Sequence, residues 1–376
     1  MTSAVRIPLW QPILVGVLAG VASLSRLLIA APDALQQMVW AEDGLFPLCV
    51  RKVGFIACLS DSFAGYLLTV PRVIAGGVAQ LPLPSWPLAT NLIAAVLVGL
   101  VSAFTYVILR SGPDPVSVPF SMLVALLPAT APIMGFETLG VIASVYTPLL
   151  FLTGLAIAMP SPQARGWRWL VAVGFLLCAL TIPSAIALVI GIAIQRWARR
   201  ISVKDAWVLG SALVIGLALQ GLVILTADEQ RSIAPTLGAL GQLGDALPNA
   251  LLTLIPGITI GPATVLDFAV TPAPGLGLVL ALALIIGGTA LVLRHRTPTS
   301  TAIGLLLLTG IVVLAVPTLT GYPNNRYFAA PVLLWAAAGL LALNSLLQSR
   351  AASTRRLVTA GLVLAMVYLW LSLIHI

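Results

Sequence analysis

Residues 88–109 read LATNLIAAVLVGLVSAFTYVIL, a stretch of 22 residues without a charged side chain. A transmembrane helix needs about 20 consecutive, mostly apolar residues, so this stretch predicts a helix that crosses a membrane. The whole chain shares this character, because 60% of its 376 residues are hydrophobic and only 8% are charged, whereas soluble domains carry roughly 25% charged residues. Lipid offers the backbone no hydrogen bonds, so the predicted fold is an all-α, polytopic integral membrane bundle.

Similar apolar stretches predict about eleven transmembrane helices within a single transmembrane domain that covers residues 1–376. We place these spans near residues 11–30, 88–109, 117–132, 137–159, 167–180, 183–197, 205–226, 274–294, 301–319, 328–347 and 356–373. They leave two long outer segments and two short outer turns, at 32–87, 227–273, 133–136 and 320–327. Within the first outer segment, the apolar stretch from Asp61 to Gln80 predicts a helix lying on the membrane surface.

The segment 167–197 carries basic residues at both ends, so one long helix would place one basic cluster outside. Cytoplasmic loops of membrane proteins carry an excess of Lys and Arg. Thr181-Ile182-Pro183-Ser184 offers a break, because proline cannot donate a backbone hydrogen bond and disfavours helix in the residue before it. We therefore predict two short helices that form a hairpin, with both basic clusters on the cytoplasmic side.

The charged residues separate by side under this topology. Thirteen of the 19 Lys and Arg residues face the cytoplasm, whereas nine of the 11 Asp and Glu residues fall on the outer side. This is the distribution of topology signals, so the formal charge of +8 does not indicate a nucleic-acid partner. We expect a multi-pass protein of a bacterial plasma membrane, surrounded by membrane lipids. The cytoplasmic basic residues are Arg6, Arg110, Arg165, Arg168, Arg196, Arg199, Arg200, Lys204, Arg294, Arg296, Arg350, Arg355 and Arg356.

Two of the three cysteines, Cys49 and Cys58, share the first outer segment. An oxidising outer face permits a disulfide between them, and closing so short a loop would stabilise the fold by about 3 kcal/mol in the chain-entropy model. Two independent apolar thiols are the alternative. No pair of His and Cys has metal-ligand spacing, which argues against a zinc site.

Four short motifs follow one another along the chain and are expected on its outer side. Trp40-Ala41-Glu42-Asp43-Gly44 follows the first span and places two acidic residues side by side. Together, the motifs resemble the GT-C class of integral membrane glycosyltransferases, and they are spread over nearly the whole chain. The chain departs from this class by lacking a soluble C-terminal domain, and it matches no single subfamily. The other three motifs are Gly65-Tyr66 through Pro71-Arg72, Ala179-Leu180-Thr181-Ile182-Pro183 and Asn325-Arg326-Tyr327-Phe328.

The resemblance implies an inverting enzyme with a polyprenyl-phosphate sugar as donor and a hydroxyl of a glycan, lipid or protein as acceptor, at the outer face. The transferred group would be a hexosyl or pentosyl unit. Such a transfer needs a base close to the attacking oxygen, and we expect Asp43 in this role, with Glu42 second. Adjacent acids point in different directions, so one can reach the acceptor while the other binds a cation or a backbone amide. A solvated loop or a helix N-cap is the alternative for this pair.

Glu137 stands in a short outer turn, where a charge near hydrocarbon is costly unless it is paired or used. In GT-C enzymes a second acid in an outer loop helps to shape the site or binds a divalent cation, and Glu137 fits that position. The alternative is that Glu137 is simply an acidic residue at a helix N-terminus, where the helix dipole favours a negative charge. The sequence leaves open whether Mg²⁺ or Mn²⁺ is needed, and it indicates no other cofactor.

The leaving group would be an anionic lipid phosphate, and Arg is suited to holding phosphate oxygens bidentately. Arg326, next to Tyr327, is the first candidate for this contact. Arg72 and Arg26 are further candidates, and Arg26 lies about one turn before the end of the first span. Snorkelling to the membrane interface is the alternative for these arginines. The candidates for the acceptor cavity, or else for interface anchors, are Tyr66 and Tyr146.

Two other functions remain open from the sequence. A transporter or lipid flippase also has many spans, and a non-catalytic membrane scaffold is the third possibility. The chain has no Walker-type phosphate loop, which favours a lipid-linked over a nucleotide-linked sugar donor. Convergence of Asp43, Glu137 and Arg326 on one outer cavity would favour the transferase.

The last residues, Leu371-Ser372-Leu373-Ile374-His375-Ile376, resemble a translated sequencing adapter. We therefore expect the natural chain to continue beyond Trp370 with other residues. In that case the last span is incomplete, and the lack of a soluble C-terminal domain carries no weight against the GT-C resemblance.

Overall fold

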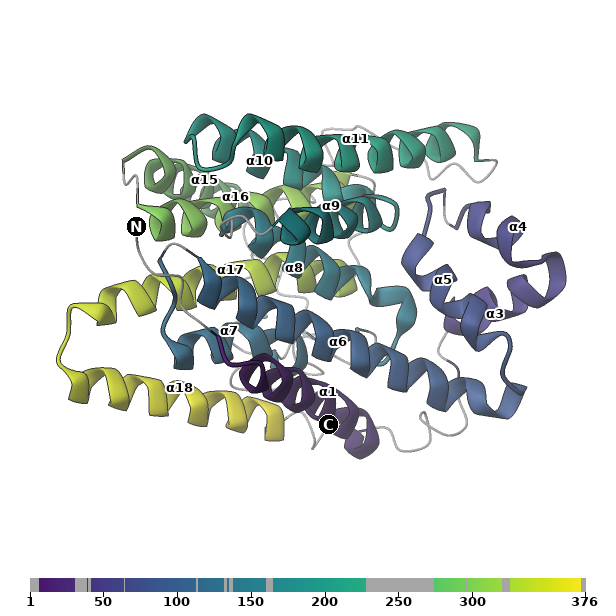
Figure 1. The fold of residues 1–376 in the computed structure, drawn as a ribbon, viewed down its shortest axis with the longest axis horizontal. Coiled ribbons are helices and arrows are strands. Elements are labelled where there is room, and N and C mark those ends of the chain that lie inside the picture. Colours follow the sequence, from purple (N-terminus) through teal and green to yellow (C-terminus); the bar gives the residue numbers. More distant parts are fainter. Residues whose placement is uncertain are drawn as a thin grey trace.

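The protein is an all-helical bundle in a computed structural model (Figure 1). Within the residues that the structure describes, the only extended pairing is an isolated β-bridge between Phe63 and Tyr66. The predicted all-α class is therefore confirmed for this part of the chain. The described residues are 7–30, 39, 42–63, 65–112, 114–131, 134, 138–159, 165–227, 274–294, 297–319 and 325–372.

A helix lies at each of the predicted spans. Among the described residues, four helices are long and apolar enough to cross a membrane by length and composition, and they support the class of membrane protein: Leu83–Ser111, Val203–Thr226, Pro298–Pro317 and Tyr327–Gln348. The bundle helices are α1 (Trp10–Ala30), α6 (Trp86–Ser111), α7 (Val118–Thr130), α8 (Tyr146–Ala158), α9 (Arg165–Ala179), α10 (Ala187–Trp197), α11 (Val203–Thr226), α15 (Pro274–Arg294), α16 (Pro298–Leu319), α17 (Asn325–Gln348) and α18 (Ala352–Ser372).

The fourth predicted span, 137–159, is too long at its beginning. Helix α8 begins only at Tyr146, after the short 3₁₀ helix η2, Ile142–Ser144. Gly140 has a φ of 77°, in the left-handed region that favours glycine, and this conformation interrupts any helix that would start earlier. The amides at the beginning of η2 are consequently available to a partner outside the helix.

The predicted hairpin is present. Helix α9 ends at Ala179, the 3₁₀ helix η3 covers Pro183–Ile186, and α10 returns through the bundle. The break coincides with the proline identified in the sequence, whose ring cannot continue the preceding helix.

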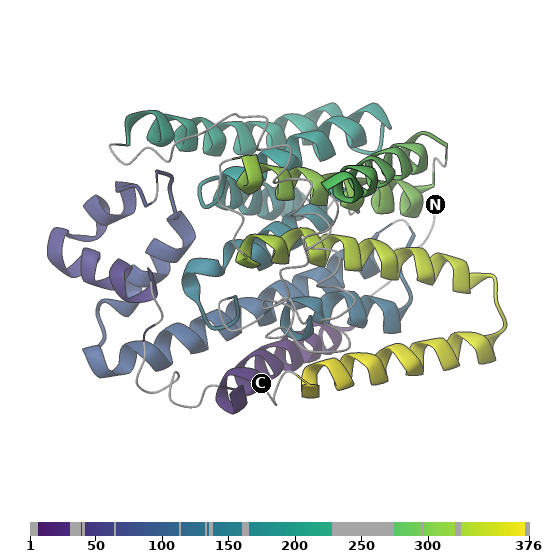
Figure 2. The same ribbon diagram turned by 180° about the vertical axis from the view of Figure 1, so that it is seen from behind.

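Three short helices, α3 (Glu42–Val53), α4 (Phe55–Ser60) and α5 (Thr69–Val78), cover one end of the bundle, at the right in Figure 1. We call them the α3–α5 cap. The opposite end, where α6, α10 and α17 end and α7, α11 and α18 begin, is called the basic end (Figures 1 and 2). The predicted surface helix over 61–80 is wrong in extent, because α5 begins only at Thr69. Helices α3 and α4 were not predicted, because Pro47 and Gly54 interrupt a segment of mixed polarity.

Polar contacts attach the α3–α5 cap to the bundle. The side-chain amide of Gln220 on α11 exchanges two hydrogen bonds with the backbone of Leu67, at 2.9 and 3.0 Å. The hydroxyl of Thr69 donates to the carbonyl of Leu180 at 2.8 Å, at the turn of the hairpin. Gln220 is buried, and an unpaired amide there would cost free energy. These bonds therefore fix the position of the cap.

Helices α1 and α6 pack at their glycines, as small residues do at interfaces between membrane helices. A Cβ atom added to Gly99 would lie 2.7 Å from the carbonyl oxygen of Gly16, and one added to Gly20 would lie 3.3 Å from that of Ala95. The two backbones are thus closer than any larger residue allows.

We expect Gly99→Ala to lower the unfolding temperature of the purified protein in detergent. The new methyl group must push the α1 backbone away, and such overpacking costs about 1–3 kcal/mol. Gly221→Ala on α11 is the matched control, because no described residue lies within 4 Å of a Cβ there, and the substitution should be neutral or stabilise by up to about 1 kcal/mol through helix propensity. Equal unfolding temperatures for the two variants would contradict the packing of α1 on α6.

Candidate functional site

Asp43 lies in the first turn of α3 and is buried, with 1% of its surface exposed. Its Oδ2 accepts the backbone N–H of Ile142 at 2.7 Å, and its Oδ1 accepts that of Ala143 at 2.8 Å. These amides open the 3₁₀ helix η2, which leads into α8. Asp43 therefore caps, from α3, a helix end that follows it about a hundred residues later in the chain.

Burial raises the pKa of the Asp43 carboxyl from 3.8 to about 7. Desolvation is the largest cause. The hydrogen bonds from Ala143 and Ile142 oppose the rise because they favour the ionised carboxylate, and the nearby charge of Glu42 adds to it. Near neutral pH the protonated and ionised forms of Asp43 are thus both populated, a condition that suits a group transferring protons.

Glu42 differs from its neighbour in exposure. Its side chain is half-buried at the start of α3, whereas Asp43 is buried. The structure thus separates the acidic pair into one carboxylate bound by backbone amides and one that is partly accessible. The sequence predicted that one acid would bind a backbone amide while the other reached the acceptor. The acid that binds the amides is Asp43, the residue expected as the base, so the capping alternative describes its contacts.

Tyr146 and Tyr327 stack on each other, with ring centroids 6.0 Å apart and planes 23° apart. Tyr146 begins α8, and Tyr327 lies in the first turn of α17, beside Arg326. Both tyrosines are buried. Since Ile142 and Tyr146 are about one helical turn apart, the contact brings the start of α17 near the segment that binds Asp43.

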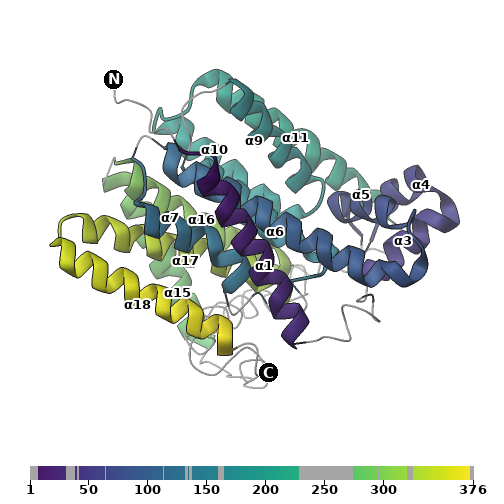
Figure 3. The same ribbon diagram turned by 60° about the horizontal axis from the view of Figure 1, so that its bottom comes forward.

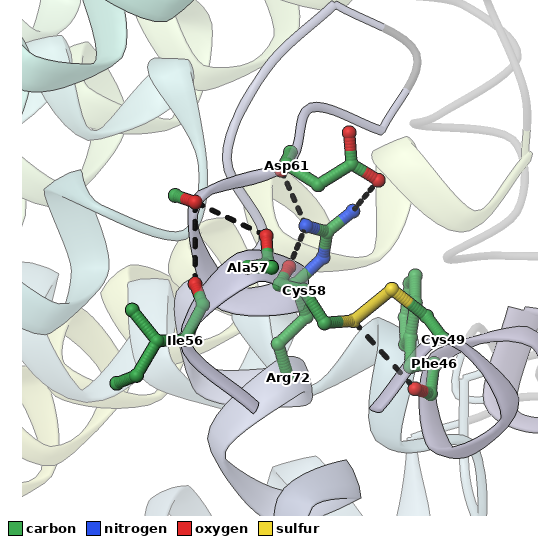
Figure 4. A network of polar contacts seen from close by, with 8 residues as sticks. Phe46, Cys49, Ile56, Ala57, Cys58, Asp61 and Arg72 are labelled. Carbon is green, nitrogen blue, oxygen red and sulfur yellow. Dashed lines mark hydrogen bonds and ion pairs between the residues drawn. A yellow bond between two sulfur atoms is a disulfide. The ribbon is translucent and has the colours of Figure 1, made fainter. Parts of the chain in front are cut away.

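Arg72 is buried within the α3–α5 cap, with 2% of its surface exposed (Figure 4). Its guanidinium donates to the carbonyls of Cys58 and Asp61, and it lies 3.7 Å from the Asp61 carboxylate. The ring of Phe46 lies 5.5 Å from the guanidinium carbon. A donor phosphate would have to displace these contacts, so the geometry favours a structural part for Arg72 rather than the predicted phosphate contact.

Arg26 also binds groups of the protein itself. Its guanidinium donates to the carbonyls of Ala129 and Ala131 at 3.2 and 3.4 Å, at the C-terminal end of α7. A cation at this end is favoured by the helix dipole. The structure therefore gives Arg26 a helix-capping contact, and shows no contact between it and Asp43 among the described residues.

The remaining predicted residues are placed only in part. Tyr66 is half-buried and packs against the apolar cluster that contains Phe46 and Ile142. Glu137 lies outside the described residues, as does the side chain of Arg326. The predicted convergence of Asp43, Glu137 and Arg326 therefore stays a prediction.

Cys49 and Cys58 form a disulfide with their Cα atoms 5.7 Å apart, so the first of the two alternatives for this pair holds (Figure 4). The bond joins α3 to α4, and Arg72 holds the end of α4. Together they fix the helix that carries Asp43. No signal in the sequence pointed to Phe46 or to the amides of Ile142 and Ala143, because their role depends on contacts between distant segments.

No group of three His, Cys, Asp or Glu residues that could hold a metal ion occurs in the described part of the chain. Each oxygen of Asp43 accepts one backbone amide. Glu137, the other predicted cation ligand, lies outside this part, so the divalent cation also stays a prediction.

We expect the difference in stability between the wild type and Asp43→Asn to depend on pH. The folded protein holds a proton on Asp43 up to about pH 7, whereas the unfolded chain releases it near its ordinary pKa of 3.8. Stability contributed by this proton is thus greatest below pH 4 and is lost as the pH rises through about 7, with a magnitude of a few kcal/mol. Thermal unfolding in detergent at pH 5 and pH 8 measures it.

Titrating groups far from Asp43 affect both proteins alike, so the difference between them reports on Asp43 together with Glu42, whose charge acts on it. Asp43→Asn should be the less stable protein throughout, because its NH₂ group must face an amide N–H of Ile142 or Ala143. The gap in unfolding temperature should be wider at pH 5 than at pH 8. A gap that widens with rising pH would show that the pKa of Asp43 is lowered instead.

We also expect Arg72→Gln to loosen the α3–α5 cap, because it leaves the carbonyls of Cys58 and Asp61 without their donor. An unsatisfied buried group costs about 1–3 kcal/mol. The readouts are the unfolding temperature and the rate of proteolysis within α3 and α4. Lys52→Gln is the control, since Lys52 is exposed on the same cap. Equal effects of the two substitutions would refute the bracing role of Arg72.

The site therefore consists of a buried carboxylate at the end of the bundle opposite the basic end, held on amides of η2, with the start of α17 close by.

Neither the protein-family models nor the curated proteins give a match to this chain.

Proposed function

We propose that the protein is a glycosyltransferase of GT-C type that moves a sugar from a polyprenyl-phosphate donor to a hydroxyl of a cell-envelope glycan, lipid or protein. The main support is Asp43, a buried carboxylate whose pKa of about 7 lets it accept a proton near neutral pH. Its place at the end away from the basic end agrees with an active site on the outer face, if the basic end faces the cytoplasm. The order of motifs that resembles the GT-C class is the second support.

In this proposal the acceptor oxygen attacks the anomeric carbon of the donor sugar. The bond between that carbon and the phosphate oxygen breaks, and its electron pair leaves with the lipid phosphate. Asp43 takes the proton of the acceptor hydroxyl. Attack opposite to the leaving group inverts the configuration at the anomeric carbon.

Asp43 keeps capacity for this proton while it caps η2. A carboxylate offers about four lone-pair sites, and two backbone amides occupy one site on each oxygen. Because Asp43 is buried, the acceptor must displace local packing to reach it. Glu42 is half-buried beside it and is the second candidate for the base.

The lipid phosphate requires cations near the same end. Arg26 and Arg72 already serve carbonyl groups of the protein, which leaves Arg326 as the principal candidate among the predicted arginines. Arg326 lies in the first turn of α17, and a helix N-terminus attracts anions. Tyr327 anchors this turn by stacking on Tyr146. Glu137 retains its predicted part in shaping the site.

The test is sugar transfer by purified protein, with a panel of polyprenyl-phosphate sugars and extracted envelope acceptors. We expect Asp43→Asn and Arg326→Gln each to lower the rate at least 100-fold, the lower end of the range for losing a catalytic base. Asp114→Asn is the matched control, because Asp114 is exposed and its carboxylate accepts from Thr299, at the beginning of α16.

Because Asp43→Asn also removes a helix cap, two further measurements separate catalysis from folding. The wild-type rate should rise with pH around pH 7 as Asp43 ionises, and Glu42→Gln should retain most of the activity with a lower midpoint. Full transfer by well-folded Asp43→Asn would exclude Asp43 as the base. Loss in Glu42→Gln alone would assign that role to Glu42.

A further inference from the structure

A cavity of about 420 Å³ opens at the basic end, between the start of α7, the end of α17 and the first turns of α18. Figure 3 shows α18 (yellow) alongside α17, with α7 next to them. Ser117 and Phe120 line the cavity from α7, Asn344 and Gln348 from α17, and Arg355 and Arg356 from α18. It lies at the opposite end of the bundle from Asp43 and belongs to no part of the proposed transferase site.

The lining of this cavity is strongly cationic. Arg355 and Arg356 supply two positive charges, and none of the described residues that line the cavity is acidic. Neither arginine forms an ion pair within the described part of the chain. Both lie near the N-terminus of α18, where the helix dipole is positive and disfavours a cation. Two exposed arginines held there leave a positive field that an anion would neutralise.

The surroundings of the cavity are apolar. Phe120 and Leu347 form part of its wall, and Leu357 and Leu364 of α18 are 74% and 68% exposed on the neighbouring helix surface. A lone phosphate ion would leave this apolar surface uncovered. A lipid satisfies both properties, because its phosphate can meet the arginines while its acyl chains follow the apolar surface of α18.

The polar groups inside the cavity add hydrogen-bonding capacity. Asn344 is buried, and its side-chain oxygen accepts the hydroxyl of Ser117 at 2.7 Å. Ser117 is the N-cap residue of α7, but its hydroxyl makes this bond instead of capping the helix. The start of α7 thereby adds a second helix N-terminus to the positive surroundings.

We propose that this cavity binds the headgroup of an anionic phospholipid, with Arg355 and Arg356 on the phosphate. The lipid would fill the space between α18 and the end of α17. Because it bridges α18 to α7 and α17, its binding stabilises the position of α18 in the bundle.

The experiment uses the full chain, purified and stripped of lipid in a neutral detergent. Phosphatidylglycerol or phosphatidylcholine with the same acyl chains is added, and bound lipid is counted by native mass spectrometry while the unfolding temperature is followed. We expect phosphatidylglycerol to bind at least about tenfold more tightly than phosphatidylcholine, since each arginine near an anionic lipid contributes to binding. Only phosphatidylglycerol should raise the unfolding temperature.

Substitutions at the cavity test whether the lipid binds there. Arg355→Gln with Arg356→Gln should remove the preference for phosphatidylglycerol, and Arg355→Lys with Arg356→Lys should retain most of it, which separates lost charge from lost folding. The matched control is Arg196→Gln with Arg199→Gln, two exposed residues on or near the end of α10 that do not line the cavity. This control should keep the preference.

Three outcomes would overturn the proposal. Equal binding of the two lipids would show that charge plays no part. Equal losses in the cavity variant and in the control would assign the effect to the general charge of the basic end. The same rise in unfolding temperature with inorganic phosphate alone would identify a free anion as the ligand instead of a lipid.

Discussion

A helix that ends inside an apolar bundle leaves amides or carbonyls without water, and they must find partners within the protein. Side chains from distant segments meet this need here. Asp43 binds the amides that begin η2, Arg26 binds carbonyls at the end of α7, and Gln195 binds the last carbonyls of α8 at 2.8 and 2.9 Å. Arg72 serves the end of α4 and Arg51 the end of α5. Acids meet helix N-termini and arginines meet C-termini, as the helix dipole favours.

This requirement changes how the candidate site is understood. Charged residues are few in this chain, so an acid or arginine near a predicted membrane span is readily interpreted as catalytic. Arg26 and Arg72 are buried on protein carbonyls, which explains their presence without a substrate. Asp43 fits both a structural and a catalytic role, because the burial in which it caps η2 also raises its pKa to about 7. The same desolvated carboxylate would therefore serve both structural capping and proton transfer, and a mutation of Asp43 would affect both.

The two ends of the bundle differ in what they offer to a lipid. At the α3–α5 cap, a disulfide and the Arg72 contacts fix a carboxylate close to the start of α17. At the basic end, uncompensated arginines surround a cavity with apolar walls. Under the proposals made here, a lipid-linked substrate meets the first end and an anionic membrane lipid occupies the second. Under both proposals Arg would bind phosphate, at one end for chemistry and at the other for stability.

The sequence by itself determined the helical class, the positions of the bundle helices and the break at Pro183, because apolar length and proline geometry act locally. It also identified the acidic pair and the two cysteines that bond. It could not supply the late start of α8, the helices α3 and α4, or the partners of Asp43, Arg26 and Arg72. Those depend on which helix ends meet, and the partners lie about a hundred residues away for Asp43 and Arg26. Only the tertiary structure decided these pairings, because the hydrogen-bonding demand of a buried helix end is met by whichever side chain packing brings to it.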